Sequence, residues 1–343
     1  MTAWFGASGS GKTTLLKAMA GLIRPALGRI VFGDEVWFDS HTKVHQPPWE
    51  RRIAFSFQTD TLLNHLTVAK NLRMVRARPK SSDAPGIDEL ATRFAIDGWM
   101  DRKPAELSGG QRQLVLLVRT LVQDARMLLM DEPLSSLDAI ARSRVADLLR
   151  ETIDRLRIPV WVVTHDRDEV RRLATDVVVL SGGSVIQQGP VADVFASPST
   201  VETAELVGVE SMMVGRVTGV ADAVAEVKCE DLRLHVVVPG SLDVAVGTPV
   251  VLGIRGEDVV LVNDEMAGGD EHSSVQNRLT LPITSVTDLG ATIRIRLGHK
   301  QGLVAVVTRR AMQKHAYAAG QSMTAWVKAS AIHMMIDRAH HTA

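Results

Sequence analysis

The chain has 343 residues, of which 45% are hydrophobic and 23% are charged, a balance typical of a globular protein of about two domains. Lys plus Arg number 39, as do Asp plus Glu, so the formal net charge is zero. The overall charge therefore does not favour binding to nucleic acid or to an anionic membrane. No apolar run reaches the roughly 18 residues of a membrane span, and no signal peptide is visible. The single cysteine, Cys229, excludes an internal disulfide and fits a reducing cytosol. Its strand-like surroundings favour a half-buried structural thiol over a reactive one.

The first motif is the sequence GASGSGKT at residues 6–13, which matches the phosphate-loop pattern G-x-x-x-x-G-K-[ST]. Glycines let the backbone turn tightly and bring its N–H groups to phosphate oxygens. Lys12 places a positive charge on the outer phosphates, and the Thr13 hydroxyl can bind Mg²⁺. We predict a strand over residues 2–5 and a helix over residues 14–20 whose N-terminus faces the anion. These elements favour a nucleotide site over a Gly/Ser-rich linker that fits by accident.

A nucleotide-binding domain normally has strands before its phosphate loop, whereas only five residues precede Gly6 here. We expect a missing or mis-assigned start rather than a domain that has lost its opening sheet. Strands are predicted next over residues 28–33 and 36–38, and over residues 51–58, where the last residue is Gln58. By itself, a Gln at a strand end usually indicates only a surface amide. From Val68 to about residue 125 the pattern is helical, interrupted by prolines and a glycine.

Two further motifs follow in the same half of the chain. The sequence LSGGQ at residues 107–111 combines a helix-starting Ser with two glycines, which indicates a second anion site built without lysine. An apolar run from Met127 then ends in Asp131 and Glu132, which predicts a buried strand with carboxylates at its C-terminal edge. Asp131 can hold the Mg²⁺ shell, and Glu132 can orient a water molecule.

A comparable buried strand is predicted over residues 159–166, where His165 lies at the strand's end. A lone histidine is more often structural. Because this one lies at the tip of a core strand, in a sheet that already carries phosphate and Mg²⁺ groups, we favour a functional role. Residues 177–180 and 184–187 are predicted to form a hairpin around Gly182 and Gly183.

After about residue 208 the helical patterning gives way to short β-rich runs, beginning at residues 213–217. A polar, acidic linker is predicted at about residues 263–272, and a second β-rich set extends from residue 279 to 335. The two sets have a similar rhythm, which suggests two copies of a small barrel. We therefore divide the chain into residues 1–208 and 209–343.

Taken together, these motifs resemble the ATP-binding subunits of ABC transporters, in that family's order and spacing, over residues 1 to about 208. The resemblance implies an α/β P-loop NTPase (ABC ATPase) domain with a helical subdomain, followed by an all-β, OB-like domain of the TOBE/Mop type. It implies Walker A at residues 6–13, the Q-loop at Gln58, the signature at 107–111, Walker B at 127–131 and a D-loop at 136–138.

The resemblance also implies a role for each matching residue. Glu132 is the general base, His165 the switch histidine, and Lys12 the third catalytic group. Thr13, Gln58 and Asp131 hold Mg²⁺. The implied ATP contacts are Gly6, Ser8, Gly9, Gly11, Lys12, Thr13, Thr14, Gln58, Ser108, Gly110 and Asp138. In this family two subunits sandwich two ATP molecules, so Ser108 and Gly110 face the partner's nucleotide, which explains an anion site without its own lysine.

The C-terminal part resembles the molybdate-binding version of the importer accessory domain, at residues 273–279 and 327–331. Residues 62–73 are also similar to molybdate importers. The implied substrate is molybdate, or tungstate. Asn277, Arg278 and Lys328 supply donors that suit a tetrahedral dianion, although each also fits a solvent-facing role. Gln276 departs from the arginine common at its position, and the adenine-stacking aromatic of the family has no counterpart before residue 6.

The expected activity is hydrolysis of ATP, with Mg²⁺, coupled to anion import. The expected partners are a second copy of the chain, a membrane permease and, indirectly, a periplasmic or extracellular binding protein, with no nucleic acid. The expected location is the cytoplasmic face of the cell membrane. Alternatives are an importer subunit for sulfate, iron, polyamine or sugar, and an intracellular molybdate sensor with an impaired motor. A DNA- or ribosome-acting ATPase is disfavoured because the chain has no long coiled-coil insertion or paired cassette.

Overall fold

The structure is a computed structural model that describes residues 1–57, 61–75, 85–240, 242–262, 275–298, 300 and 302–336. Its internal contacts divide the chain into two compact units, Met1–Val194 and Phe195–Ala343. The predicted boundary near residue 208 falls later, after helix α8 (Val201–Val207). In the structure α8 contacts β13 (Pro249–Ile254), a strand of the second unit.

The first unit is built on a six-stranded sheet in the order β5-β6-β7-β1-β8-β9. Neighbouring strands run parallel except for β9, which pairs antiparallel with β8. All five residues of β6 are buried, as expected for a central strand covered on both faces. The strands are β1 (Thr2–Phe5), β5 (Ile53–Ser56), β6 (Met127–Asp131), β7 (Val160–Thr164), β8 (Asp176–Ser181) and β9 (Ser184–Pro190).

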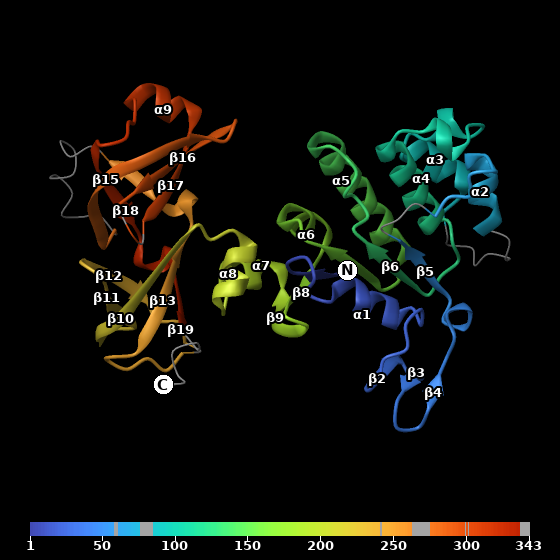
Figure 1. Ribbon diagram of the computed structural model, residues 1–343, viewed down its shortest axis with the longest axis horizontal. Helices are drawn as coiled ribbons and strands as arrows, with labels where there is room; N and C mark the ends of the chain where they lie inside the picture. The colour runs from blue at the N-terminus through green and yellow to red at the C-terminus, as the bar shows by residue number, and fades with distance from the viewer. Residues whose placement is uncertain are drawn as a thin grey trace. The chain divides into compact units, whose positions relative to one another are not determined.

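Three helices of this unit pack together as one group. Figure 1 shows α2, α3 and α4 gathered beside the β5–β6 side of the sheet, and α2 and α3 both contact α4. This group confirms the helical region predicted from residue 68. The bounds are α1 (Lys12–Met19), α2 (Val68–Val75), α3 (Ile87–Arg93), α4 (Gly109–Leu121), α5 (Ala139–Leu156), α6 (Arg167–Leu173) and α7 (Val191–Ala196), the last of which spans the unit boundary.

A small antiparallel sheet of β2 (Arg29–Phe32), β3 (Glu35–Asp39) and β4 (Val44–His45) extends from the main sheet (Figure 1). The fully buried Arg51 ties it to α1. Its guanidinium donates to the carbonyls of Ala18 and Met19 at the end of the helix, and to those of Trp37 and Gln46. Since burying a cation is costly unless its donors are satisfied, these bonds fix the end of the helix that begins at Lys12.

The second unit contains two five-stranded sheets, in the orders β12-β11-β10-β13-β19 and β14-β18-β15-β16-β17. The two sheets share one hydrophobic core. The strands are β10 (Ser211–Ala221), β11 (Val224–Cys229), β12 (Leu232–Val237), β14 (Val260–Val262), β15 (Asn277–Asp288), β16 (Thr292–Leu297), β17 (Leu303–Thr308), β18 (Ser322–Val327) and β19 (Ile332–Ile336), with helix α9 at Arg309–His315.

These sheets differ from two separate barrels because they exchange strands. β14 follows the first set in sequence but pairs with β18 of the second set. β19, at the end of the second set, returns to pair with β13. Each sheet is therefore completed by the other half of the sequence. Cys229 lies in the shared core at 2% exposure, deeper than predicted, and burial, with the nearby negative charge of Glu230, raises the pKa of its thiol to about 11.

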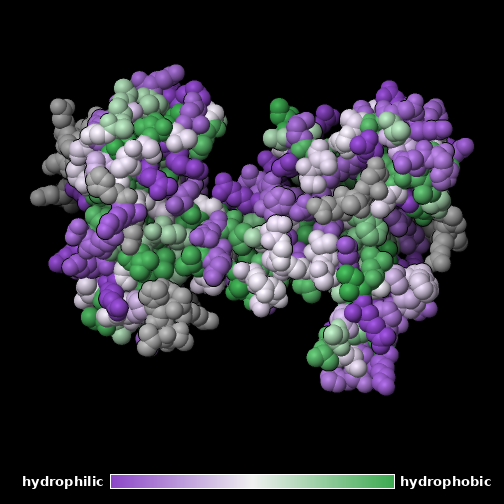
Figure 2. Space-filling view, viewed as in Figure 1, coloured by the Kyte–Doolittle hydropathy of each residue, from purple (hydrophilic) through white to green (hydrophobic). Residues whose placement is uncertain are grey.

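The visible surface carries polar and apolar residues in small groups (Figure 2). Within the described residues, no helix is long and apolar enough to cross a membrane.

Candidate functional site

The phosphate loop joins the end of β1 to the start of α1. Gly9 and Gly11 have φ angles of +82° and +94°, which side-chain-bearing residues rarely adopt, so the loop's path depends on glycine at both positions. A Cβ on Gly6 would lie 2.2 Å from the carbonyl oxygen of Leu180 on β8. The loop is therefore packed tightly against the sheet. Ser8 lies exposed within it, and Thr14 lies in the first turn of α1.

Lys12 is 6% exposed, and its ammonium group is held inside the loop. Nζ donates to the carbonyl oxygens of Gly6 and Ala7, at 2.8 and 2.7 Å, and to Ser10 Oγ at 3.3 Å. Burial lowers the pKa of Lys12, while the negative charges of Glu132 and Asp131 act in the opposite direction. A phosphate that enters the loop can therefore exchange with neutral acceptors around a cation that is already in place.

Thr13 and Asp131 form the position suited to a divalent cation. The Thr13 hydroxyl donates to Asp131 Oδ1 at 2.9 Å, although the two residues are 118 positions apart. Asp131 is 2% exposed, and burial raises its pKa, with the Thr13 hydrogen bond opposing that rise. Hydroxyl and carboxylate oxygens are ligands that Mg²⁺ prefers, with phosphates and waters completing its shell. The pair fits this ion, and no cluster of three or more acidic, His or Cys side chains suited to a metal occurs in the described residues.

Glu132 and His165 come together at the carboxyl ends of β6 and β7. Glu132 Oε1 lies 2.8 Å from His165 Nδ1. The His165 side chain is 61% exposed and that of Glu132 is 18% exposed, so the pair lies where a ligand could reach it. Glu132 has a φ angle of +48°, an unfavourable conformation for a residue with a side chain. A strained backbone beside a polar pair at this sheet edge is characteristic of a reactive site.

The sequence LSGGQ forms the start of α4, as predicted. Ser108 is the N-cap: its Oγ accepts from Gln111 N–H, and its own N–H donates to Gln111 Oε1 at 2.9 Å. Ser108 and Gly109 are exposed, so the positive end of a 13-residue helix faces outward. Gly110 packs closely on a later loop, because a Cβ there would lie 3.3 Å from Leu137 Cδ2.

The loop that follows β6 is linked to the loop that follows β7 through Arg142 on α5. Its guanidinium donates to the carbonyl of Leu137 at 2.9 Å and to Asp166 Oδ2 at 2.7 Å. Asp138, one of the predicted nucleotide contacts, caps α5 by accepting from Ala141 N–H. Burial alone would raise the pKa of Asp166, but backbone N–H groups and Arg142 lower it overall. Arg142 carries no motif of its own, so the sequence did not indicate it.

Thr164, the residue before His165, contacts a carboxyl group that is also absent from the predicted set. Glu169 is 5% exposed and accepts a hydrogen bond from the Thr164 hydroxyl at 2.6 Å. Burial raises the pKa of Glu169 to about 7. The Asp166-x-x-Glu169 spacing is a helix-start signal that could have identified the N-cap Asp166, whose Oδ1 accepts from two backbone N–H groups of α6.

Gln113, two residues beyond LSGGQ, also joins the site. Its side chain on α4 reaches the segment just after Glu132 and hydrogen-bonds to Ser136 N–H. Gln58, which we predicted as both an ATP and an Mg²⁺ contact, lies outside the described residues.

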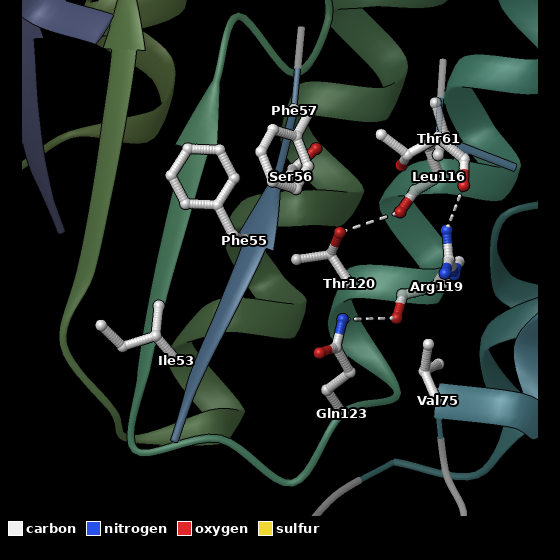
Figure 3. Close-up of a pocket in the computed structure, with 10 residues that line it drawn as sticks. All are labelled: Ile53, Phe55, Ser56, Phe57, Thr61, Val75, Leu116, Arg119, Thr120 and Gln123. Carbon is white, nitrogen blue, oxygen red and sulfur yellow. Dashed lines mark hydrogen bonds between the residues drawn. The ribbon is translucent and has the colours of Figure 1, made fainter. Parts of the chain in front are cut away.

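A pocket of about 250 Å³ lies beside the strand that leads to Gln58. Residues of β5 line one side of it and residues of α4 line the other (Figure 3). Arg119 on α4 donates to the carbonyl of Thr61 at 2.8 Å, and the Phe55 and Phe57 rings lie 4.3 Å apart. The wall is thus partly aromatic and partly polar.

The three residues predicted for an oxyanion site lie on neighbouring backbone, because Asn277 pairs with Val327 next to Lys328. Asn277 is 1% exposed, and its amide nitrogen donates to the carbonyls of His235 and Val327, while its oxygen accepts from His235 N–H. Both hydrogens are used, so Asn277 has none to donate to an anion in this structure. The exposed Arg278 lies over the Trp326 ring at 4.8 Å.

The chain matches two family models: that of the ABC transporter over residues 1–135 and that of the TOBE domain over residues 273–334. It is 34% identical to the molybdenum import ATP-binding protein ModC of Pseudomonas fluorescens, in an alignment that covers 97% of this chain and 92% of the relative. It is also 34% identical to the ModC protein of Methylococcus capsulatus, over 98% of this chain and 92% of the relative.

A ModC protein of Brucella melitensis is 42% identical over 195 residues, which are 57% of this chain. That match spans about half of the relative's length, 54%. Among solved structures, a bacterial Atm1-family ABC exporter with ATP bound aligns with a TM-score of 0.50 and 23% identity. The alignment covers 60% of this chain and 36% of the exporter, and it shows a shared fold.

Proposed function

Because the chain belongs to the molybdenum import ATP-binding proteins of the ABC transporter family, we propose that it hydrolyses ATP to drive molybdate uptake through a membrane permease. The observation that carries this proposal is the contact between Glu132 and His165 beside the Lys12–Thr13 loop. It supports a site in which phosphate-binding groups and a water-activating group meet at one sheet edge.

The proposed hydrolysis begins with ATP phosphates bound by the loop's N–H groups and by Lys12. Thr13 and Asp131 hold Mg²⁺, which when bound neutralises charge on the outer phosphates. Glu132 accepts a proton from the attacking water and so orients it in line with the phosphate bond that breaks. The His165 ring holds the Glu132 carboxylate in place through Nδ1, and its other ring nitrogen can donate to the γ-phosphate only when both nitrogens carry a proton. Lys12 stabilises the charge that develops during transfer.

A second copy of the chain completes each site in this proposal. Ser108 and Gly109 lie exposed at the positive end of α4, in a segment that has no lysine. Free N–H groups at such a helix end bind phosphates. The partner copy's γ-phosphate is the proposed ligand, with Ser108 and Gly110 as contacts. ATP would therefore hold two copies together, and hydrolysis would release them.

The permease is proposed to dock at the pocket between β5 and α4 (Figure 3). The pocket's Phe55 and Leu116 side chains offer apolar contact, and Gln123 adds an amide group to its lining. A short permease helix would fit this mixture. The chain would then act as a peripheral subunit at the cytoplasmic face of the membrane, and an external binding protein would deliver the anion to the permease.

The second unit is the proposed oxyanion sensor, with Arg278 and Lys328 as the charged contacts. Guanidinium and ammonium groups suit a tetrahedral dianion such as molybdate or tungstate. Since Asn277 is fully hydrogen-bonded to backbone groups, its proposed role is to hold the strands that present these two side chains.

The function is tested by co-purifying the chain with its permease in proteoliposomes that contain an external binding protein. Molybdate outside should stimulate ATP hydrolysis and enter the vesicles, whereas sulfate, iron, polyamine and sugar should do neither. The Glu132→Gln variant should abolish both activities. Stimulation by sulfate alone would show that sulfate, and not molybdate, is the transported anion. A chain that binds molybdate without hydrolysing ATP would favour the sensor function.

A further inference from the structure

The side chain of Gln113 forms a clamp between α4 and the segment that carries Glu132. Its Oε1 accepts from Ser136 N–H at 2.6 Å, and its Nε2 donates to the carbonyl of Glu132 at 3.1 Å. Nε2 also lies 3.4 Å from Ser135 Oγ. We infer that Gln113 is a positioning residue that holds the backbone of Glu132 and couples it to the helix beginning at Ser108. This inference rests on the proposed ATPase function.

The chemistry of the partners fixes which way the amide points. A backbone N–H can only donate, so the Ser136 N–H requires the amide oxygen. A carbonyl can only accept, so Glu132 requires the amide nitrogen. Glutamine is thus matched to one acceptor, on Glu132, and one donor, on Ser136. Neither a carboxylate nor a thioether reproduces both contacts.

The segment after β6 needs such support because Glu132, the proposed base, has an unfavourable backbone conformation. Glu132 has a φ angle of +48°, and the turn after it is closed by Ser135, whose N–H and hydroxyl both donate to the Glu132 carbonyl. A residue held in the left-handed region persists only where surrounding contacts over-determine it. Gln113 adds a contact from outside the turn, so it ties the turn to another element.

The same helix carries the groups proposed to face the partner's ATP. Gly110 packs against the loop so closely that a Cβ would lie 3.3 Å from Leu137 Cδ2 and 3.5 Å from the Ser136 carbonyl. A movement of α4 therefore shifts Ser136 and, through Gln113, the Glu132 carbonyl. Binding of the partner copy's ATP at the Ser108 end of α4 would therefore change the position of Glu132, the base in the chain's own ATP site.

Two substitutions separate the halves of the clamp. Gln113→Met keeps the side chain's length and removes both hydrogen bonds. Gln113→Glu keeps an acceptor for Ser136 N–H and places a carboxylate against the Glu132 carbonyl. Gln188→Met, at an exposed position on edge strand β9, is the matched control. Each variant is assayed as the full chain for kcat, for the KM for ATP, for its urea midpoint, and for hydrogen exchange of residues 132–137.

Gln113→Met is expected to lower kcat by roughly tenfold or more with the KM for ATP changed by less than about twofold, because a displaced base affects the transition state and not ground-state binding. Exchange of the Ser136 amide should be roughly tenfold faster. Gln113→Glu should lose kcat similarly but keep the Ser136 amide protected. Gln188→Met should match the wild type.

The inference is overturned if Gln113→Met retains wild-type kcat, if its loss lies in KM, or if Ser136 exchange is unchanged. A wild-type chain without ATPase activity would refute the proposed function instead. In that case the exchange measurement still decides whether the clamp exists.

Discussion

Glu132 Oε1 and His165 Nδ1 lie 2.8 Å apart at the ends of two strands that are neighbours in the sheet but 33 residues apart in sequence. The β6–β7 register, in which Asp131 pairs with Val163, places the residue after β6 beside the residues that end β7. The contact therefore follows from the parallel pairing, which brings the carboxyl ends of both strands to one edge.

Replacing Glu132 with Gln should lower kcat by on the order of 10²- to 10⁴-fold while ATP binding remains, because the amide cannot accept the proton of water. Size-exclusion chromatography with ATP should show a trapped dimer. Glu202→Gln, at an exposed position on α8, serves as the control. Unchanged turnover in Glu132→Gln would mean that another group is the base.

Replacing Lys12 with Ala should reduce kcat by on the order of 10²-fold and also weaken ATP binding, because the cation held at the loop's carbonyls is removed. Isothermal titration with a non-hydrolysable ATP analogue measures the affinity. Lys70→Ala, an exposed lysine on α2, should bind the analogue as the wild type does. Equal affinity in both variants would contradict the assignment of Lys12.

Glu169 should make the first unit less stable as pH rises. Its carboxyl has an ordinary pKa of 4.5 when unfolded and a pKa of about 7 when buried beside Thr164. Between these values Glu169 binds more protons in the folded chain than in the unfolded chain, so its contribution to stability falls with increasing pH across this window. The contribution is up to about 3 kcal/mol.

Glu169→Gln removes this titration and should flatten that part of the profile. The free energy of unfolding, measured by urea at pH 4.5, 6 and 8, should fall less for Glu169→Gln than for the wild type. Asp168→Asn, at the exposed neighbouring position, is the control. Parallel wild-type and Glu169→Gln profiles would show that the pKa of Glu169 is the same in the folded and unfolded chains.

Asn277→Ala should destabilise the second unit by about 2 kcal/mol or more. The substitution leaves backbone groups of His235 and Val327 without the hydrogen bonds that the Asn277 amide makes to them. Urea unfolding followed by hydrogen exchange of residues 232–237 measures the change. Gln276→Ala, at the exposed preceding position, should have little effect. A stable Asn277→Ala variant with weakened molybdate binding would instead support the ligand role predicted from sequence.

The sequence alone identified the functional groups that lie within one short motif or at the ends of predicted strands. The loop at residues 6–13 specifies its own backbone path through glycine, and its lysine lies within the motif. Asp131 and His165 end apolar runs that favour buried strands, and parallel strands present their carboxyl ends at one edge of the sheet. The P-loop domain and the TOBE-type accessory domain, which the resemblance to ABC transporter subunits implied, both match family models.

Only the tertiary structure decided contacts between groups that carry no local signal. Gln113 meets Ser136 because α4 packs on the loop after β6, and nothing in the residues around either one indicates it. The exchange of β14 and β19 depends on long-range strand pairing, which short β-rich runs of similar rhythm leave undetermined. Asn277 has the polarity of a ligand, but burial and three backbone partners use its hydrogen-bonding capacity, and burial is a property of the folded chain.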